Sequence, residues 1–176
     1  TDNQIIEKYC YDNDSSYCNE YGGLYLWDEM MQYVSLPGIK GICPLSWHIP
    51  TDEEWKILEG EVDSQYGYPD PEWDQINWRG FDVGGSLKET GTTHWLSPNL
   101  GATNLSGFTA LPAGFHDTDG TYDGIATWGN LWTSSEYNGI SNWCRSLSYQ
   151  FQKSSRTHFS KNVGLGFGFS VRCVKD

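Results

Sequence analysis

The chain has 176 residues, which fits one domain that buries its own core, and 15% of its residues are aromatic, which excludes a disordered segment. Its 11 Lys and Arg residues against 23 Asp and Glu residues give a formal net charge of -12, so the phosphate backbone of a nucleic acid would be repelled. No apolar stretch approaches the roughly 18 residues that a membrane-spanning helix needs. We therefore expect a single domain over residues 1–176, with no nucleic-acid partner and no direct membrane insertion.

Leu24, Trp27, Met30 and Val34 follow one another at a spacing of three to four residues. This spacing is typical of an amphipathic helix and predicts one over residues 25–34. Pro and Gly residues then break any regular element until Thr51.

A second helix is predicted to begin at Thr51. Thr51 followed by Glu54 is a capping box, in which each side chain binds the backbone N–H of the other residue. Trp55, Leu58 and Val62 would then share one apolar face. We assign the neighbouring His48 to packing, because no second His or Cys lies at a ligand spacing from it.

Residues 64–107 are rich in Gly, Pro, Asn and Asp, which predicts long ordered loops with a short helical turn around residues 85–90. After residue 107, short apolar or alternating pieces between turn signals predict strands.

Asp119-Gly120 predicts a hairpin turn between strands near 112–117 and 121–128. Asp117, Asp119 and Asp123 also raise the alternative of a calcium site. Because the segment lacks the regularly spaced acidic loop and the distal bidentate Glu of the calcium hand, we favour a plain hairpin and expect no cofactor.

Five cysteines bear on the compartment. A Cys10–Cys18 disulfide would close a short, hairpin-like polar loop and contribute about 2 to 3 kcal/mol, and a Cys43–Cys173 disulfide would contribute on the order of 5 kcal/mol. Two such bonds would leave Cys144 unpaired. The alternative is five reduced thiols in the cytosol, but no zinc-type C-x-x-C spacing competes for them, so we favour an exported protein.

Five segments in order along nearly the whole chain are similar to the Fibrobacter succinogenes major paralogous domain family, a bacterial family. They are "EKYCYDND", "GICPLSWHIPTDEEW", "GATNLSGFTALPAGF", "LWTSSEYN" and "GFSVRCVKD". The resemblance implies disulfides Cys10–Cys18 and Cys43–Cys173. It also implies a strand region upstream of Thr1, which we expect this chain to lack.

The family in turn resembles the formylglycine-generating, sulfatase-modifying group: "HIPTDEEW", "GNLW" and "GFSV" are similar to motifs of that group. The implied fold is C-type-lectin-like, an α+β class with two helices, a small twisted antiparallel sheet and long loops. The coarse pattern along the chain agrees with this fold.

The chemistry of the formylglycine-generating group is not expected here. Those enzymes use two reactive, copper-binding cysteines late in the chain, and here only Cys144 is available besides Cys173. No other standard catalytic signature occurs. An oxidative enzyme of that type, using Cys144 with a metal, is kept as the alternative function.

The segment 137–163 favours binding instead. Trp143, Arg145 and Leu147 alternate with a second set of residues, which predicts a strand with one core face and one exposed face. Short polar side chains interleaved with aromatic residues are typical of recognition surfaces. The segment is also similar in position to the variable segment of C-type-lectin-fold proteins diversified by retroelements, which display ligand contacts on a rigid scaffold.

We therefore expect a non-enzymatic, exported adhesion module at the cell surface, outside the cell or on a phage particle. Its partner would be a protein or a glycan on another surface, with Trp95 as a further contact. A purely structural spacer domain is the remaining alternative. The expected ligand-binding residues are Tyr137, Asn138, Ile140, Asn142, Cys144, Ser146, Ser148, Gln150, Gln152, Ser154, His158, Ser160 and Asn162.

Overall fold

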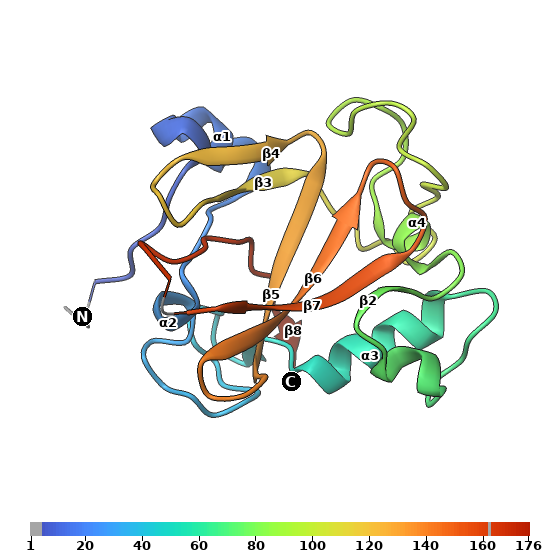
Figure 1. Ribbon diagram of the computed structural model, residues 1–176, viewed down its shortest axis with the longest axis horizontal. Coiled ribbons are helices and arrows are strands. Elements are labelled where there is room, and N and C mark those ends of the chain that lie inside the picture. Colours follow the sequence, from blue (N-terminus) through green and yellow to red (C-terminus); the bar gives the residue numbers. More distant parts are fainter. Residues whose placement is uncertain (1–4, 162) are drawn as a thin grey trace.

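The helix with the strongest start signal forms as expected. In the computed structural model, which describes residues 5–161 and 163–176, α3 spans Asp52–Val62 (Figure 1). The Thr51 hydroxyl accepts the Glu54 backbone N–H at 3.1 Å, and the Glu54 carboxylate accepts the Thr51 N–H at 2.8 Å. The predicted capping box is confirmed, and Trp55 on the predicted apolar face is buried.

The helix expected over 25–34 is much shorter. Helix α2 spans only Trp27–Met30. Gln32 and Tyr33 have φ angles of 53° and 58°, in the left-handed region, so the helix cannot continue. Val34, expected on the apolar face, is 38% exposed.

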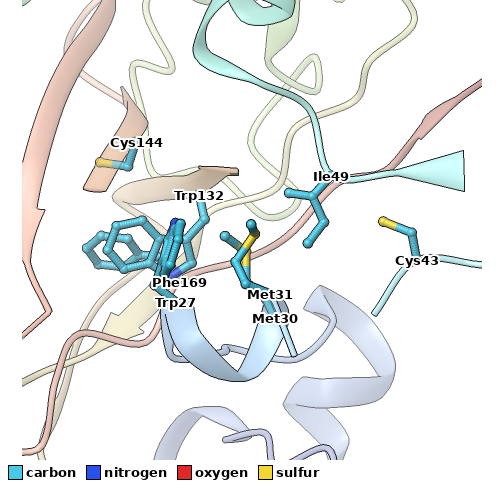
Figure 2. Packing of buried hydrophobic residues seen from close by; sticks show 8 residues of the cluster. All are labelled: Trp27, Met30, Met31, Cys43, Ile49, Trp132, Cys144 and Phe169. Atoms are coloured by element: carbon cyan, nitrogen blue, oxygen red, sulfur yellow. The ribbon is translucent and has the colours of Figure 1, made fainter. Parts of the chain in front are cut away.

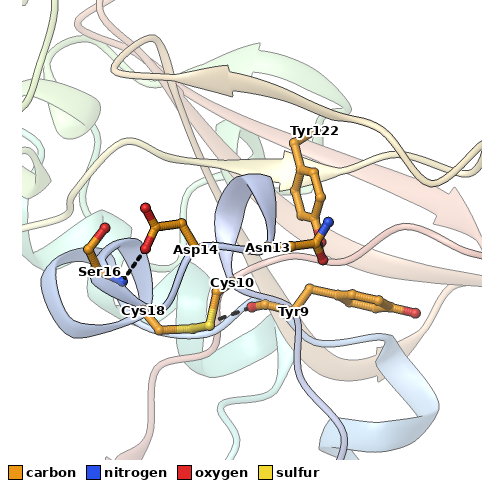
Figure 3. The surroundings of a disulfide bond; sticks show 7 residues. All are labelled: Tyr9, Cys10, Asn13, Asp14, Ser16, Cys18 and Tyr122. Carbon is orange, nitrogen blue, oxygen red and sulfur yellow. Dashed lines mark hydrogen bonds between the residues drawn. A yellow bond between two sulfur atoms is a disulfide. The ribbon is translucent and has the colours of Figure 1, made fainter.

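The Cys10–Cys18 disulfide is present, but the segment it closes is helical and not hairpin-like (Figure 3). It contains the 3-10 turn η1 (Tyr11–Asn13) and the start of helix α1 (Ser15–Tyr21). The Asp14 carboxylate accepts the Ser16 N–H at 2.8 Å and so caps α1. This N-cap is a signal that the sequence contains and that the prediction did not use.

The middle third is loop-rich, as predicted, with three short elements. The 3-10 turn η2 spans Pro71–Asp74, and α4 spans Val83–Leu87, slightly earlier than the turn expected at 85–90. Strand β2 (Asn77–Arg79) was not expected. It forms because it pairs antiparallel with a strand far along the chain.

Strands dominate after residue 107, which confirms that prediction. The hairpin around Asp119-Gly120 is formed by β3 (Ala113–His116) and β4 (Tyr122–Ile125), paired antiparallel. The six-stranded sheet has the order β2-β7-β6-β5-β3-β4, and a two-stranded sheet pairs β1 with β8. The remaining strands are β1 (Trp47–His48), β5 (Trp128–Glu136), β6 (Ser141–Ser148), β7 (Ser154–Ser160) and β8 (Val174–Lys175).

The large sheet has two distinct faces, because opposed residues of paired strands project to the same side. Arg145 opposes Arg156, and both reach carboxylates of α3; we call this side the α3 face. Ser146 opposes Ser155 on one side and Asn130 on the other, and these residues project to the opposite face.

Two apolar clusters form the core. On the opposite face, Trp132 and Cys144 pack with Phe169 and with Trp27 and Met30 of α2 (Figure 2). The second cluster lies between α3, α4 and the sheet, and it includes Trp55, Trp73, Leu87, Trp95, Leu131 and Leu147. The Cys43–Cys173 disulfide, also present, joins the chain before α3 to the C-terminal segment beside the first cluster.

The turn between β6 and β7 is held by a buried lysine. The Lys88 ammonium donates to the carbonyl oxygens of Leu100, Ser148 and Phe151 at 3.0, 2.8 and 2.9 Å. Burial lowers the pKa of Lys88 to about 8, so the ammonium form still predominates at pH 7. Lys88 therefore fixes the position of Phe151 relative to the sheet.

In the two described ranges, no helix has the length and apolar character needed to cross a bilayer. The described chain is thus a mixed α+β domain in which one sheet carries helix α3 on one face and an aromatic core on part of the other.

Candidate functional site

The expected exposed set on β6 is buried. Asn142, Cys144, Ser146 and Ser148 are 0, 0, 5 and 1% exposed. The prediction of one open face was wrong because β6 is an inner strand of the sheet and side chains cover both of its faces. The alternating core set of Trp143, Arg145 and Leu147 is confirmed.

The other residues expected to contact a ligand differ in how far they are exposed. Ser154 is fully buried, and Trp95 is 1% exposed with its indole N–H bound to the Ala110 carbonyl, so neither lies on an open surface. Asn162 lies outside the described residues. The residues that reach solvent are Tyr137, Asn138, Ile140 and Gln150, and Gln152, His158 and Ser160 are half-buried.

Four of the predicted residues come together with Trp143 at one end of β6. We call Tyr137, Asn138, Ile140, Trp143 and His158 the tip cluster. The Tyr137 and His158 rings stack at 4.0 Å with an interplanar angle of 16°, and Trp143 meets the Tyr137 ring edge-on at 4.7 Å. Tyr137 and Ile140 remain 43% and 57% exposed.

Backbone hydrogen bonds fix the turn that displays these side chains. The Asn138 carboxamide oxygen accepts the N–H groups of Ile140 and Ser141 at 3.3 and 3.0 Å. The Tyr137 N–H donates to the Ser141 carbonyl at 2.7 Å, and the Lys161 N–H donates to the Ile140 carbonyl at 3.0 Å. The exposed Tyr and Ile are therefore presented on an ordered turn.

Below the tip cluster, Arg156 connects it to α3. Its guanidinium donates to the Asp52 carboxylate from Nη2 at 2.7 Å and from Nε at 3.0 and 3.1 Å. Burial raises the pKa of the Asp52 carboxyl, but the hydrogen bonds and charges of Arg156 and Arg145 outweigh it and lower the pKa to about 2. Asp52 is therefore a carboxylate over the whole physiological range.

The ionic layer continues under the sheet. Glu59, Arg79 and Arg145 have fully buried side chains, and both guanidinium groups donate to the Glu59 carboxylate. The Ser154 hydroxyl also donates to Glu59, at 2.8 Å. These groups bind one another and so join α3 to the sheet.

Cys144 is a poor nucleophile in this setting. Its thiol is buried among Trp132, Phe169 and their neighbours, as Figure 2 shows. Burial raises the pKa of Cys144 to about 12, although Arg145 and Ser146 act in the other direction. Reactive cysteines have a lowered pKa and solvent access, and Cys144 has neither.

The hairpin aspartates each bind their own turn. Asp119 accepts the N–H and the hydroxyl of Thr121 at 2.9 and 2.6 Å, and Asp123 accepts the Gly124 N–H at 2.6 Å. Across residues 5–161 and 163–176, no group of three or more His, Cys, Asp and Glu side chains is placed to hold a metal.

His48, which was assigned to packing, also contacts two carboxylates. Its Nδ1 lies 2.7 Å from Asp176 Oδ1, and its Nε2 lies 2.8 Å from Glu54 Oε1. Burial lowers the pKa of His48, but the two carboxylates outweigh it and raise the pKa. His48 thus ties the C-terminus to the start of α3, which is a structural role.

A cavity of about 420 Å³ lies away from the predicted residues. It is bordered by the end of α1 around Tyr21 and by the C-terminal segment around Arg172. The Arg172 Nη2 donates to the Thr109 carbonyl at 3.1 Å, and Glu20 lies 3.2 Å from His94 Nε2. The two charged residues that line this cavity, Glu20 and Arg172, therefore already have partners within the protein.

Comparison with known protein families matches residues 1–175 to the Fibrobacter succinogenes major domain. Searches of the curated proteins and of the solved structures gave no match. The match covers nearly the whole chain, including the cysteine-containing segments and the capped helix described above. This chain belongs to the Fibrobacter succinogenes major domain family.

Proposed function

We propose that this chain is an exported, non-enzymatic ligand-binding module with a C-type-lectin-like fold. Two disulfides support an oxidising compartment, outside the cell or at its surface. The C-type-lectin-like assignment is supported by the mixed α+β architecture, with a mainly antiparallel sheet and long loops between α4 and β3.

The observation that carries the proposal is the tip cluster. Exposed Tyr137 and Ile140 stand on a hydrogen-bonded turn, and His158 and Trp143 support the Tyr137 ring from below. A rigid aromatic anchor on an ordered turn loses little conformational entropy on binding. The ligand would be a protein or a glycan on another surface.

An oxidative enzyme that uses Cys144 gains no support from the site. The thiol is buried, its pKa is raised to about 12, and no second free cysteine exists in the described chain. We therefore infer a binding role without catalysis.

The test compares the wild-type chain with Tyr137→Ala/Ile140→Ala on a glycan array and a panel of cell-surface proteins. The control is Leu105→Ala, which removes an apolar side chain that is 81% exposed on a loop before β3. We expect wild type and Leu105→Ala to bind the same ligand and the double variant to lose at least tenfold in affinity while its far-UV circular dichroism is unchanged. Equal binding by all three proteins would place recognition elsewhere, and binding by none would favour the structural spacer.

A further inference from the structure

A second aromatic group lies on the opposite face of the sheet, at the other end of β6. Trp78 on β2 opposes Ser155, Ser155 opposes Ser146, and Trp128 on β5 opposes Ser148. All of these side chains therefore project to the opposite face. The tip cluster lies on the α3 face, and its Trp143 is three to five residues along β6 from Ser146 and Ser148, roughly 10 to 17 Å away.

The two indoles reach toward each other across the strands that separate them. Strands β7 and β6 lie between β2 and β5, a separation of about 14 Å at ordinary strand spacing. The ring centroids of Trp78 and Trp128 are nevertheless 6.0 Å apart, at an interplanar angle of 32°. The rings thus cover the small side chains between them, which explains why Ser146, Ser148 and Ser155 are buried.

Phe151 extends this surface. Its ring lies 4.5 Å from that of Trp78, and it is 40% exposed. We call Trp78, Trp128 and Phe151 the aromatic shelf. Trp78 and Trp128 are half-buried, and neither indole nitrogen is among the buried atoms that lack a partner in the described chain. The shelf therefore presents partly exposed aromatic rings, fixed by two strands and by the turn that Lys88 holds.

A small pocket continues the shelf along β5. Gly124 is the link, because a Cβ there would lie 3.0 Å from Trp128 and 3.1 Å from Phe115. Phe115 borders a pocket of about 160 Å³. The other residues that line it are Asp117, Asn130, Phe159, Phe167 and Phe169.

The pocket offers one donor and one acceptor over an aromatic floor. The Asn130 oxygen accepts the Ser146 hydroxyl at 2.6 Å, whereas its amide nitrogen has no acceptor among the described residues. Asn130 is 95% buried, since its exposed fraction is 5%. Asp117 Oδ1 accepts the Thr118 N–H and hydroxyl at 2.6 and 3.2 Å, which leaves the second carboxylate oxygen as an acceptor.

We propose that the aromatic shelf and this pocket bind a neutral glycan chain. The apolar C–H face of a pyranose ring matches the aromatic rings, and neighbouring hydroxyls match a paired amide donor and carboxylate acceptor. The rings of Phe151, Trp78 and Trp128, with Phe115 on the other side of Gly124, suit a chain of several sugar units. This site is separate from the tip cluster, so it stands without the proposed function.

Charge argues against two other ligand classes. An anionic glycan would meet Asp117 and a chain of net charge -12. A quaternary ammonium group would use the aromatic rings and Asp117, but it would leave the Asn130 donor facing a cation. A neutral polyhydroxylated ligand uses every group that the surface offers.

The experiment is affinity electrophoresis of the full chain in gels that contain one soluble polysaccharide each. The neutral probes are a β-1,4-linked glucan, a xylan, a mannan and starch, and the anionic probe is polygalacturonate. The variants are Trp128→Ala and Asn130→Asp, which keeps the size of the side chain but removes the amide donor. Trp47→Ala, at a Trp that is 38% exposed on β1, is the matched control.

We expect at least one neutral polysaccharide to retard the wild-type chain and Trp47→Ala, and polygalacturonate to retard neither. Trp128→Ala on the shelf and Asn130→Asp in the pocket should each lose at least tenfold in affinity for that polysaccharide. Tyr137→Ala/Ile140→Ala should keep the wild-type affinity. If Trp128→Ala fails to fold, two other readouts remain. One is the affinity of Asn130→Asp. The other is the tryptophan emission of the wild-type chain, which should shift to shorter wavelength when an oligosaccharide binds. Absence of retardation by every neutral probe, undiminished binding by folded shelf and pocket variants, or retardation by polygalacturonate alone would overturn the proposal.

Discussion

The guanidinium carbon of Arg156 lies 3.5 Å from the centre of the Trp143 ring. The same guanidinium binds Asp52 at the start of α3, and Trp143 contacts the exposed Tyr137 ring. One side chain thus connects the buried ionic layer to the tip cluster. The rigidity of the proposed recognition surface therefore depends on buried residues behind it.

Arg156→Lys should loosen this connection. Lysine keeps the charge, but it offers neither the planar stacking surface nor the paired donors of a guanidinium. We expect a loss of about 2 kcal/mol in the free energy of unfolding, measured in urea. The same change at Arg172, whose hydrogen bond goes to an exposed carbonyl, should cost less; an equal or larger cost at Arg172 would contradict this role of Arg156.

Glu59→Gln should be among the most destabilising single changes in the chain. It removes the negative charge that Arg79 and Arg145 share in a fully buried site, so Arg79 loses its carboxylate partner and Arg145 is left with Asp52. The expected loss is about 3 to 5 kcal/mol. Glu61→Gln, two residues along α3 at an exposed position, is the control and should change stability little. Similar unfolding midpoints for both variants would refute the structural role of the ionic layer.

Acid should destabilise the fold through Asp52. The pKa of the Asp52 carboxyl is lowered to about 2 in the folded protein. The ionised carboxylate therefore stabilises the fold fully at any pH above the unfolded-state pKa of about 4. This stabilisation is lost as the pH falls from about 4 to about 2. The contribution is about 2 kcal/mol, and urea unfolding at a series of pH values measures it. Asp52→Asn should be less stable at pH 7 and should show a shallower loss over this window. A variant with the same acid profile as the wild type would show that another carboxyl controls the transition.

The free thiol should be silent in the native protein. Cys144 is fully buried and its pKa is raised to about 12, so it should resist a thiol reagent such as dithionitrobenzoate at pH 8. In denaturant without reductant, one thiol per chain should react, because the other four cysteines form disulfides. Rapid labelling of Cys144 in the native protein would instead support an enzyme that uses this thiol.

Lys88→Met should release the turn between β6 and β7. The change keeps the length of the side chain but leaves the carbonyl groups of Leu100, Ser148 and Phe151 without their donor. We expect a loss of about 2 to 3 kcal/mol and faster amide exchange around Phe151. Unchanged exchange there would show that the turn does not depend on Lys88.

The sequence predicts the elements that depend on local chemistry. The capping box at Thr51, the Asp119-Gly120 hairpin and the buried set of Trp143, Arg145 and Leu147 all form as expected. The family resemblance supplied both disulfide pairs, which residue spacing alone left open.

The errors come from long-range contacts. Alternation along β6 correctly separates two faces, but whether a face is open depends on what packs there, and Trp78 comes from a strand about seventy residues earlier. The short serines on that face looked like a polar surface and instead make room for the indoles. Likewise, nothing local indicates that Glu59 and Arg145 would meet, since 86 residues separate them.

The most direct test of the proposed recognition surface is a nuclear magnetic resonance titration of the isotope-labelled chain with a ligand from the array and protein screen that Trp128→Ala still binds. The account predicts that the largest shift changes fall on the backbone of residues 137–140 and on the His158 ring, with the core signals of Trp132 and Phe169 unchanged. Shift changes that leave residues 137–140 and His158 unaffected would contradict the assignment of recognition to the tip cluster.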